Sequence, residues 1–236
     1  NFEVLLVALS DDGSKSEDGF EDGSMDDLYL LELFHGPTLA FKDVGARFMA
    51  QLVGYLGSEG SALLTILAAT SGDTGSAVAQ AFFGVPDIRT VILFPKGKVT
   101  PLQERQFTTL GGNVHVLEVD GTFDDCQRLV KAAFSDPLLA EEVRLSSANS
   151  INIGRLLPQI FYYVHAAAQL PEGSAPLFSV PSGNFGNLTD GLMAKRLGVE
   201  CRGFVAVTNV NDVVPEYLQT GVVRPRPSIP TISNAM

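Results

Sequence analysis

One lysine of this chain stands where a positive charge is costly. Lys42 follows an apolar run in the segment LELFHGPTLAFKDVGARF (31–48), at the predicted start of a helix. The helix dipole disfavours a cation at this end. Such a lysine is either an exposed side chain that avoids this cost or an amine that is kept neutral, which is what Schiff-base chemistry requires. From these residues alone, an ordinary surface lysine is the simpler interpretation.

A glycine-containing turn, PSGNFGN at 181–187, lies between a predicted strand and a predicted helix. Gly183 and Gly186 would let backbone N–H groups approach a ligand, and the positive end of the helix favours an anion. Asn187 is a candidate helix cap, with Asp190 three residues later. The turn lacks GxGxxG and GK[ST], which argues against dinucleotides and nucleoside triphosphates. A phosphate cradle and a plain turn that requires glycine both stay open.

A second turn of small residues, TSGDTGSA at 70–77, has the same context. Its hydroxyl and backbone N–H donors could hold an anion or a carboxylate at the end of a strand. The tripeptide Asp73-Thr74-Gly75 also occurs in aspartic proteases, which need two carboxylates. This chain has one such tripeptide, in a βα unit rather than a β-barrel, so we favour the anion loop.

Composition excludes several classes of function. The formal charge of this 236-residue chain is −11, and residues 11–27 supply most of it with eight acidic residues and one lysine. This balance argues against a nucleic-acid-binding face, and we interpret 11–27 as a solvated surface loop. Three scattered histidines lack zinc spacing, so no metal is expected, and no apolar run has the length of a membrane span. Two isolated cysteines, Cys126 and Cys201, favour a reduced, cytoplasmic protein.

Alternating strands and helices must position these turns. Apolar runs predict strands at 28–34, 62–69, 90–94, 113–119, 177–180 and 204–207. Helical patterns occur at 42–56, 75–84, from 100 onward, at 122–134, at 151–170 with a kink at Pro158, and at 187–197. This alternation predicts an α/β fold with parallel sheets flanked by helices on both faces. Ligands of such folds bind beyond the carboxyl ends of the strands, where both turns lie.

Two of these helices carry further local predictions. Thr100 is expected to be an N-cap, with Pro101 in the first turn and Gln103 closing a capping box. The helix at 42–56 is expected to have an apolar side that includes Val44, Phe48, Leu52 and Tyr55.

Five segments together resemble threonine synthases, which are pyridoxal-phosphate enzymes with the tryptophan-synthase β-family fold. The segments are ELFHGPTLAFKD, ATSGDTGSA, FPKGKVTPLQERQ, NSINIGR and VPSGNFGN, in family order and spacing. The resemblance covers about Leu28 to Met236, and residues 1–27 match only loosely. Members of the family continue well past the position of Met236. The resemblance therefore implies a partial chain, with the partner of the pyridine nitrogen beyond it.

The resemblance implies a role for each motif. Lys42 matches the lysine that holds pyridoxal phosphate and moves protons at the substrate carbons. The phosphate of the cofactor is expected at Gly183, Asn184, Phe185, Gly186 and Asn187. The substrate, plausibly through its carboxylate, is expected at Ser71, Gly72, Asp73, Thr74 and Gly75. The leaving phosphate needs cationic or dense hydrogen-bond donors, for which the candidates are Lys96, Lys98, Asn152 and Arg155.

The implied fold is the two-domain fold type II of pyridoxal-phosphate enzymes. Residues 1–35 would be an N-terminal segment that packs on the large domain. Residues 36–145 would form the smaller α/β domain, and 146–236 the start of the large cofactor-binding domain. The implied reaction converts O-phosphohomoserine and water to L-threonine and phosphate, in a monomer or homodimer without nucleic-acid or membrane partners.

Two alternatives stay open. One is another pyridoxal-phosphate lyase of the same fold, such as a dehydratase or a β-replacement enzyme. The segments NSINIGR and FPKG argue against it, because they resemble threonine synthase specifically. The other is a catalytically silent binding protein, against which the retention of Lys42 and of the SGNFG turn argues.

Overall fold

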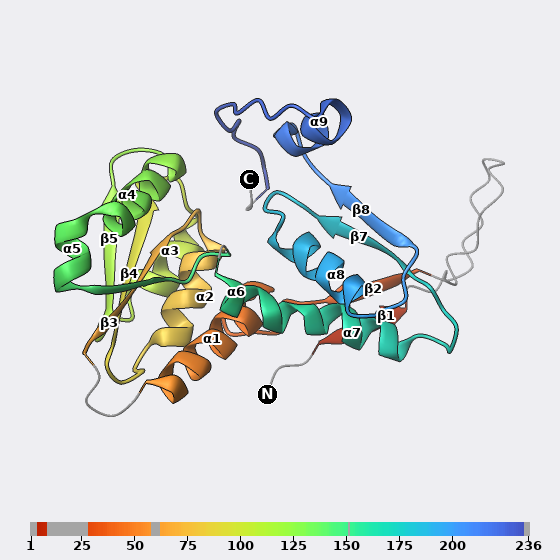
Figure 1. Ribbon diagram of the computed structural model, residues 1–236, viewed down its shortest axis with the longest axis horizontal. Helices are drawn as coiled ribbons and strands as arrows, with labels where there is room; N and C mark the ends of the chain where they lie inside the picture. The colour runs from red at the N-terminus through yellow and green to blue at the C-terminus, as the bar shows by residue number, and fades with distance from the viewer. Residues whose placement is uncertain (1–3, 9–27, 58–61, 151, 234–236) are drawn as a thin grey trace.

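The computed structural model describes residues 4–8, 28–57, 62–150 and 152–233. The acidic stretch at 11–27, which we predicted to be a surface loop, lies outside these residues. The described elements form two groups, each with its own parallel sheet, and α1 (Lys42–Leu56) and α6 (Ile153–Leu156) lie where the groups meet (Figure 1).

A four-stranded parallel sheet in the order β5–β4–β3–β6 forms the core of the first group. Nearly every residue of the two central strands is buried, as expected for a parallel sheet that is covered on both faces. The strands are β3 (Leu64–Ala69), β4 (Ile88–Pro95), β5 (Val114–Val119) and β6 (Arg144–Ser147). Strand β6 was not predicted, because its four residues carry no continuous apolar run.

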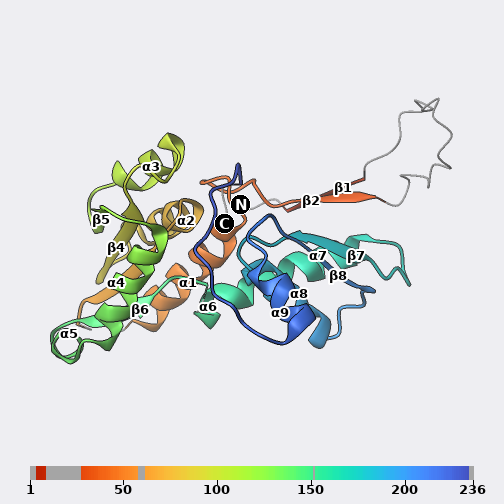
Figure 2. The ribbon, with the colours of Figure 1, turned by 90° about the horizontal axis from the view of Figure 1, so that it is seen from above.

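Helices cover both faces of this sheet (Figure 2). Successive residues of a strand point to opposite faces, so Ile66 contacts the helix layer of α1 and α2, whereas Leu67 contacts α4. The predicted capping box of Thr100 with Gln103 is present, and Thr122 forms a second one with Asp125. The helices are α1 (Lys42–Leu56), α2 (Asp73–Phe82), α3 (Pro101–Thr108), α4 (Phe123–Ser135) and α5 (Pro137–Glu142).

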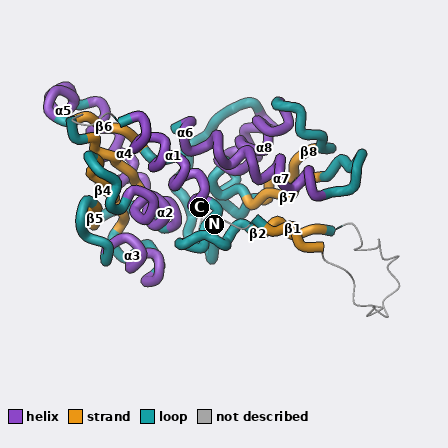
Figure 3. Tube along the Cα trace, turned by 90° about the horizontal axis from the view of Figure 1, so that it is seen from below, coloured by secondary structure: helices purple, strands orange, loops and turns teal. Residues whose placement is uncertain are grey.

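The second group contains a two-stranded parallel sheet of β7 (Leu177–Pro181) and β8 (Gly203–Val207). Figure 3 shows these strands apart from the four-stranded sheet. The predicted helix at 151–170 is interrupted as expected, because Pro158 lies in a 3-10 helix. The helical elements are α6 (Ile153–Leu156), η2 (Leu157–Gln159), α7 (Ile160–Gln169), α8 (Gly186–Arg196) and α9 (Val213–Thr220).

The first described strands belong to the second group. Strands β1 (Leu5–Ala8) and β2 (Tyr29–Glu32) pair antiparallel, and Val4, Leu31 and Leu33 pack against the core around α7. The α/β architecture with parallel sheets agrees with the prediction, whereas the three domain boundaries stay a prediction.

Helix α1 buries a different face from the one that we predicted. Phe48 and Tyr55 of the expected apolar side are 45% and 87% exposed. Small residues allow closer approach between helices, and α1 packs through them against α2 and α6. At Gly45 a Cβ atom would lie only 2.6 Å from the carbonyl oxygen of Arg155. The buried residues of α1 are Lys42, Asp43, Gly45, Ala46, Met49 and Ala50.

Candidate active site

Lys42 is the first residue of α1, and its side chain is only 11% exposed. Its Nζ atom lies 3.7 Å from Oδ2 of Asp73 and 5.4 Å from the centre of the Phe41 ring. Burial lowers the pKa of the Lys42 amine; the Asp73 carboxylate opposes this shift, and the Arg155 guanidinium adds to it. This is the environment expected for a lysine that must become neutral in order to react.

The backbone around Lys42 is held on both sides. The carboxylate of Asp43 accepts hydrogen bonds from the N–H (2.9 Å) and the hydroxyl (2.6 Å) of Thr38. The hydroxyl of Tyr162, on α7, donates to the carbonyl oxygen of Phe41. Leu39, in the same turn, has a φ of 60°, a conformation that leucine rarely adopts. These contacts fix the path of the chain into α1 and therefore the position of the Lys42 amine.

The turn after β3 is organised by Thr70. Its Oγ1 atom accepts hydrogen bonds from the N–H groups of Gly72 (2.9 Å) and Gly75 (2.7 Å). Gly72 has a φ of 142°, which favours glycine, and any Cβ there would collide with Gln103. Gln103 donates to Oδ1 of Asp73 at 2.6 Å, which leaves Oδ2 toward Lys42. The N-cap residue of α2, Gly72, has no side chain to cap the helix, and Thr70 instead occupies the N–H of Gly75 in its first turn.

A third turn, after β6, joins the first one. The amide of Asn149 makes two hydrogen bonds with the backbone of Ala69, at 2.8 Å and 3.2 Å. These bonds extend the sheet pairing beyond β6 and tie Asn149 to the end of β3.

The glycine-containing turn at 181–187 begins with Ser182, whose N–H and hydroxyl are both bonded to strand carbonyls. Our prediction that Asn187 caps the helix is wrong. The N-cap of α8 is Phe185, without a side-chain cap, and the side-chain oxygen of Asn187 accepts from the hydroxyl of Tyr163. Since α8 starts one residue earlier than predicted, Asn187 lies inside the helix. Phe185 supplies no side-chain cap to α8, and the positive end of this helix suits an anion.

This turn also approaches the turn after β6. A Cβ atom on Gly186 would lie 3.5 Å from the Cβ atom of Ser150 and 3.1 Å from Oδ1 of Asn184. Asn184 in turn accepts a 3.0 Å hydrogen bond from the N–H of Gly186. The turn after β6 thus contacts both the turn after β3 and the turn after β7. Lys42 lies beside the turn after β3.

The residues predicted to bind the leaving phosphate lie in different environments. Arg155 is 1% exposed, and its Nη1 donates to the carbonyl oxygen of Ala148 at 2.6 Å. Burial lowers the pKa of Arg155 to about 10, although its interactions with Tyr162, Asp190 and Asp43 raise this pKa. It therefore stays a cation at neutral pH.

Asn152 caps α6, as its position suggests. Its Oδ1 accepts from the N–H of Gly154 at 2.9 Å, and its Nδ2 donates to the carbonyl oxygen of Ser147 at 2.8 Å. Both ends of this amide are therefore engaged within the protein. Lys96 and Lys98 are exposed in the turn after β4.

The sequence patterns did not identify several residues around the candidate site. Gln103 was recognised only as a helix cap, and Asn149 lies in a motif whose Asn152 and Arg155 we considered instead. Their contacts join segments that are far apart along the chain, so no local pattern reveals them. The remaining missed residues are Tyr162, Gln159 and Asp190, which lie buried beside Arg155.

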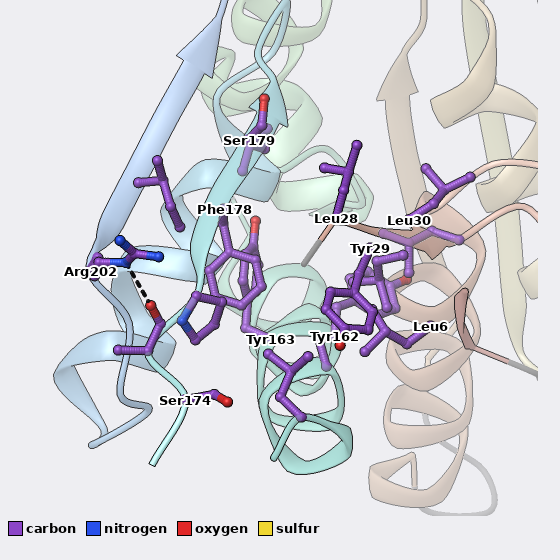
Figure 4. Close-up of a pocket in the computed structure, with 18 of the residues that line it drawn as sticks. Leu6, Leu28, Tyr29, Leu30, Tyr162, Tyr163, Ser174, Phe178, Ser179 and Arg202 are labelled. Atoms are coloured by element: carbon purple, nitrogen blue, oxygen red, sulfur yellow. Dashed lines mark hydrogen bonds between the residues drawn. The ribbon is translucent and has the colours of Figure 1, made fainter. Parts of the chain in front are cut away.

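A separate groove of about 640 Å³ lies between the β1–β2 pair and β7. Figure 4 shows Leu6, Leu28 and Leu30 on one side of it and Phe178 and Ser179 on the other. The described residues that line it include no lysine, histidine or carboxylate. Within residues 4–8, 28–57, 62–150 and 152–233 there is no cluster that could hold a metal ion. In the same ranges no helix is long and apolar enough to cross a membrane.

A family model described as "Pyridoxal-phosphate dependent enzyme" matches residues 18–236. The chain belongs to this family. Among curated members of the pyridoxal-phosphate-dependent family, it is 57% identical to the threonine synthase of Serratia marcescens over 213 residues. That match covers 89% of this chain and 49% of the relative, so the chain spans about half the length of such relatives.

Solved structures of the family agree with the fold. The crystal structure of threonine synthase from Escherichia coli superposes with a TM-score of 0.83 at 57% identity, over 89% of this chain and 49% of that one. A pyridoxal-phosphate-bound threonine synthase from Brucella melitensis has a TM-score of 0.79 at 44% identity, over 88% and 45%. These findings confirm the predicted resemblance, the α/β fold of type II and the cofactor class.

Proposed function

We propose that this chain supplies part of a threonine synthase that converts O-phosphohomoserine and water to L-threonine and phosphate. The observation that carries the proposal is the buried Lys42, whose amine lies 3.7 Å from Asp73 at the start of α2 and 5.4 Å from the centre of the Phe41 ring. The names of the relatives, at identities of up to 57%, support the same reaction. Since the chain spans about half of them, the activity is proposed for the complete protein.

The residues present fit pyridoxal phosphate. A buried amine with a lowered pKa suits attachment of its aldehyde carbon. The start of α8 has no side-chain cap, and a Cβ atom on Gly186 would intrude on Asn184 and Ser150. Glycine thus permits this close packing, and the backbone N–H groups of the turn are the kind of donor that a phosphate group needs. Lys42 would hold the cofactor through its amine, and Gly183 to Asn187 would hold its phosphate.

The cofactor, when bound, supplies an electron sink for negative charge that develops on the substrate carbons. Lys42 can accept a proton on Nζ and return it, because burial and the nearby Arg155 favour its neutral form while Asp73 stabilises its charged form. The turn from Ser71 to Gly75 would bind the carboxylate of the substrate through its remaining donors, because Thr70 occupies the N–H groups of Gly72 and Gly75. Arg155 would provide the cation that stabilises the departing phosphate.

Lys96 and Asn152 are weaker candidates for the departing phosphate. Lys96 is exposed, and the amide of Asn152 is occupied by Gly154 and Ser147. We keep both as proposed ligands, with Arg155 as the principal one because it is buried and cationic.

A different lyase of the same fold is the second candidate, since the same cofactor machinery serves elimination from simpler amino acids. The experiment that separates the two compares O-phosphohomoserine with homoserine in the full-length protein, by phosphate release and by threonine formation. Strong preference for the phosphate ester supports the proposal. Equal turnover of both substrates excludes threonine synthase and leaves the broader lyase.

The remaining sequence-based predictions concern partners and location. We expect a small-molecule substrate, a monomer or a homodimer, no nucleic-acid or membrane partner, and a cytoplasmic location. Size-exclusion chromatography with light scattering on the full-length protein distinguishes a monomer from a homodimer.

A further inference from the structure

A buried carboxylate lies one turn into the helix that follows the glycine-containing turn. Asp190 of α8 is fully buried, four residues after Gly186. Gln159 of η2 is 1% exposed, and its Nε2 atom donates to Oδ2 of Asp190 at 2.7 Å. This bond ties α8 to the segment that carries Arg155.

The other polar atom of each partner is unsatisfied. Oδ1 of Asp190 and Oε1 of Gln159 are buried, and neither has a hydrogen-bond partner among the residues that the structure describes. When Asp190 is ionised both atoms are acceptors, so they cannot bond to each other. A buried acceptor without a donor is costly, and two of them in one pair require an explanation. A proton on Asp190 removes the conflict, because a carboxylic acid can donate to an amide oxygen.

We propose that Asp190 is a positioning residue, a neutral carboxylic acid that pairs with Gln159 through two hydrogen bonds and fixes α8 with its phosphate-binding turn. In this pair Gln159 Nε2 donates to one oxygen of Asp190, and the protonated oxygen of Asp190 donates to Gln159 Oε1. Neutrality has a second effect. A negative charge one turn from the start of α8 would oppose an anion bound there, and the neutral acid avoids this.

The surroundings of Asp190 favour the proton. Burial raises the pKa of its carboxyl group to about 8, against the opposing effects of Arg155 and of the hydrogen bond from Gln159. Arg155, on α6, is the cation that faces it. Its Nε atom is also unpaired, so an ionised Asp190 that turns toward Arg155 is the rival arrangement.

The other elements packed against α8 add no competing charge. Tyr162 and Tyr163 of α7 interact with Asp190, and burial raises the pKa of both hydroxyls, which keeps them neutral. His165, the remaining titratable residue of α7, bonds to the carbonyl oxygen of Val4. Strand β8 has no titratable residue, and Lys195 and Arg196 of α8 itself lie exposed in its last turn.

The test uses Asp190→Asn and Asp190→Leu in the full-length protein. Asparagine reproduces the neutral pair, because its amide can both donate to and accept from Gln159; leucine can do neither. We expect Asp190→Asn to bind pyridoxal phosphate within about threefold of wild type at pH 7, and Asp190→Leu to bind it about tenfold or more weakly. Above pH 8 the wild type should lose cofactor affinity relative to Asp190→Asn. Spectral titration with pyridoxal phosphate measures the cofactor affinity of the wild type and of both variants.

A second measurement needs neither cofactor nor turnover. The folded pKa of Asp190 lies above its unfolded value, so its contribution to stability is complete below about pH 4 and is lost as the pH rises toward 8. The Tm of wild type minus that of Asp190→Asn should therefore fall between pH 4 and 8 and stay level above 8. An infrared carboxylic-acid band at pH 7 should disappear in Asp190→Asn.

The opposite results would overturn the proposal. A Tm difference that does not change with pH, together with no acid band, would assign an ionised Asp190 to Arg155. A loss of cofactor affinity in Asp190→Asn equal to that in Asp190→Leu would exclude the neutral pair. The affinity comparison rests on the proposed cofactor site, whereas the stability and infrared measurements do not. If the protein does not catalyse the proposed reaction, the stability and infrared measurements still test the state of Asp190.

Discussion

The Nζ atom of Lys42 lies 3.7 Å from Oδ2 of Asp73, and Gln103 holds the other oxygen of that carboxylate at 2.6 Å. Three elements therefore meet at one charge pair: Lys42 begins α1, Asp73 begins α2 and Gln103 belongs to α3. The acid that favours the charged amine is itself fixed by a neutral amide. The balance between burial and Asp73 sets how readily Lys42 loses its proton.

Replacement of Lys42 tests the site of attachment. After incubation with pyridoxal phosphate and borohydride, wild-type full-length protein should carry an adduct on the peptide that contains Lys42. Lys42→Ala should lose this adduct and its visible absorption. Lys131→Ala, at an exposed lysine of α4, is the matched control and should keep both. A wild-type adduct on Lys96 or Lys131 would contradict the assignment.

Asp73→Asn tests the charge pair. Asparagine can still accept the hydrogen bond from Gln103 but carries no charge, so the pKa of the Lys42 amine should fall further below its usual value. The rate of chemical labelling of Lys42 as a function of pH should shift toward lower pH, because the neutral amine forms earlier. An unchanged profile would mean that Asp73 does not influence Lys42.

Two glycines of α1 test the packing that positions the lysine. Gly45→Ala places a Cβ atom 2.6 Å from the carbonyl oxygen of Arg155, and we expect it to cost about 1–3 kcal/mol despite the better helix propensity of alanine. Gly54→Ala, in the same helix, meets only Val85 at 3.4 Å and should gain about 0.5–1 kcal/mol. Urea unfolding of both variants measures these changes. Equal effects would show that Arg155 yields to the new methyl group.

Removal of Arg155 tests its proposed contact with the departing phosphate. Loss of a buried, charge-assisted partner costs about 2–5 kcal/mol, so kcat/KM of Arg155→Ala for O-phosphohomoserine should fall about 30-fold or more. The pyridoxal-phosphate content should change much less. Arg155→Lys keeps the charge without the guanidinium geometry and should recover part of the activity. Phosphate release at the wild-type rate in Arg155→Ala would exclude this residue as a substrate ligand.

Local sequence patterns predicted much of the fold. The runs at 62–69, 90–94 and 113–119 are strands of one parallel sheet, and those at 177–180 and 204–207 form another. Hydrophobic period, capping residues and proline act over a few residues, so such features are legible in the chain itself. The same reasoning missed β1, β6, α5 and α9, which are short.

Side-chain burial was less predictable, as α1 demonstrates. The apolar pattern of its sequence placed Val44, Phe48, Leu52 and Tyr55 on one side. Of these, Val44 packs against a core and the other three are exposed, whereas the buried residues include Gly45 and Ala46. Close approach of α2 and α6 leaves room for small side chains only. Whether a neighbouring helix approaches closely is a property of the packed structure, which periodicity does not contain.

The sequence by itself determined the family and the type of most elements, and it singled out Lys42 as the proposed attachment residue, because motifs and periods are local. Only the tertiary structure decided what surrounds that lysine. Asp73 reaches Lys42 across 31 positions and Gln159 reaches Asp190 across 31, through α1, α2, η2 and α8. The pKa of a buried group depends on such long-range neighbours and on its distance from water, and both exist only once the helices have packed.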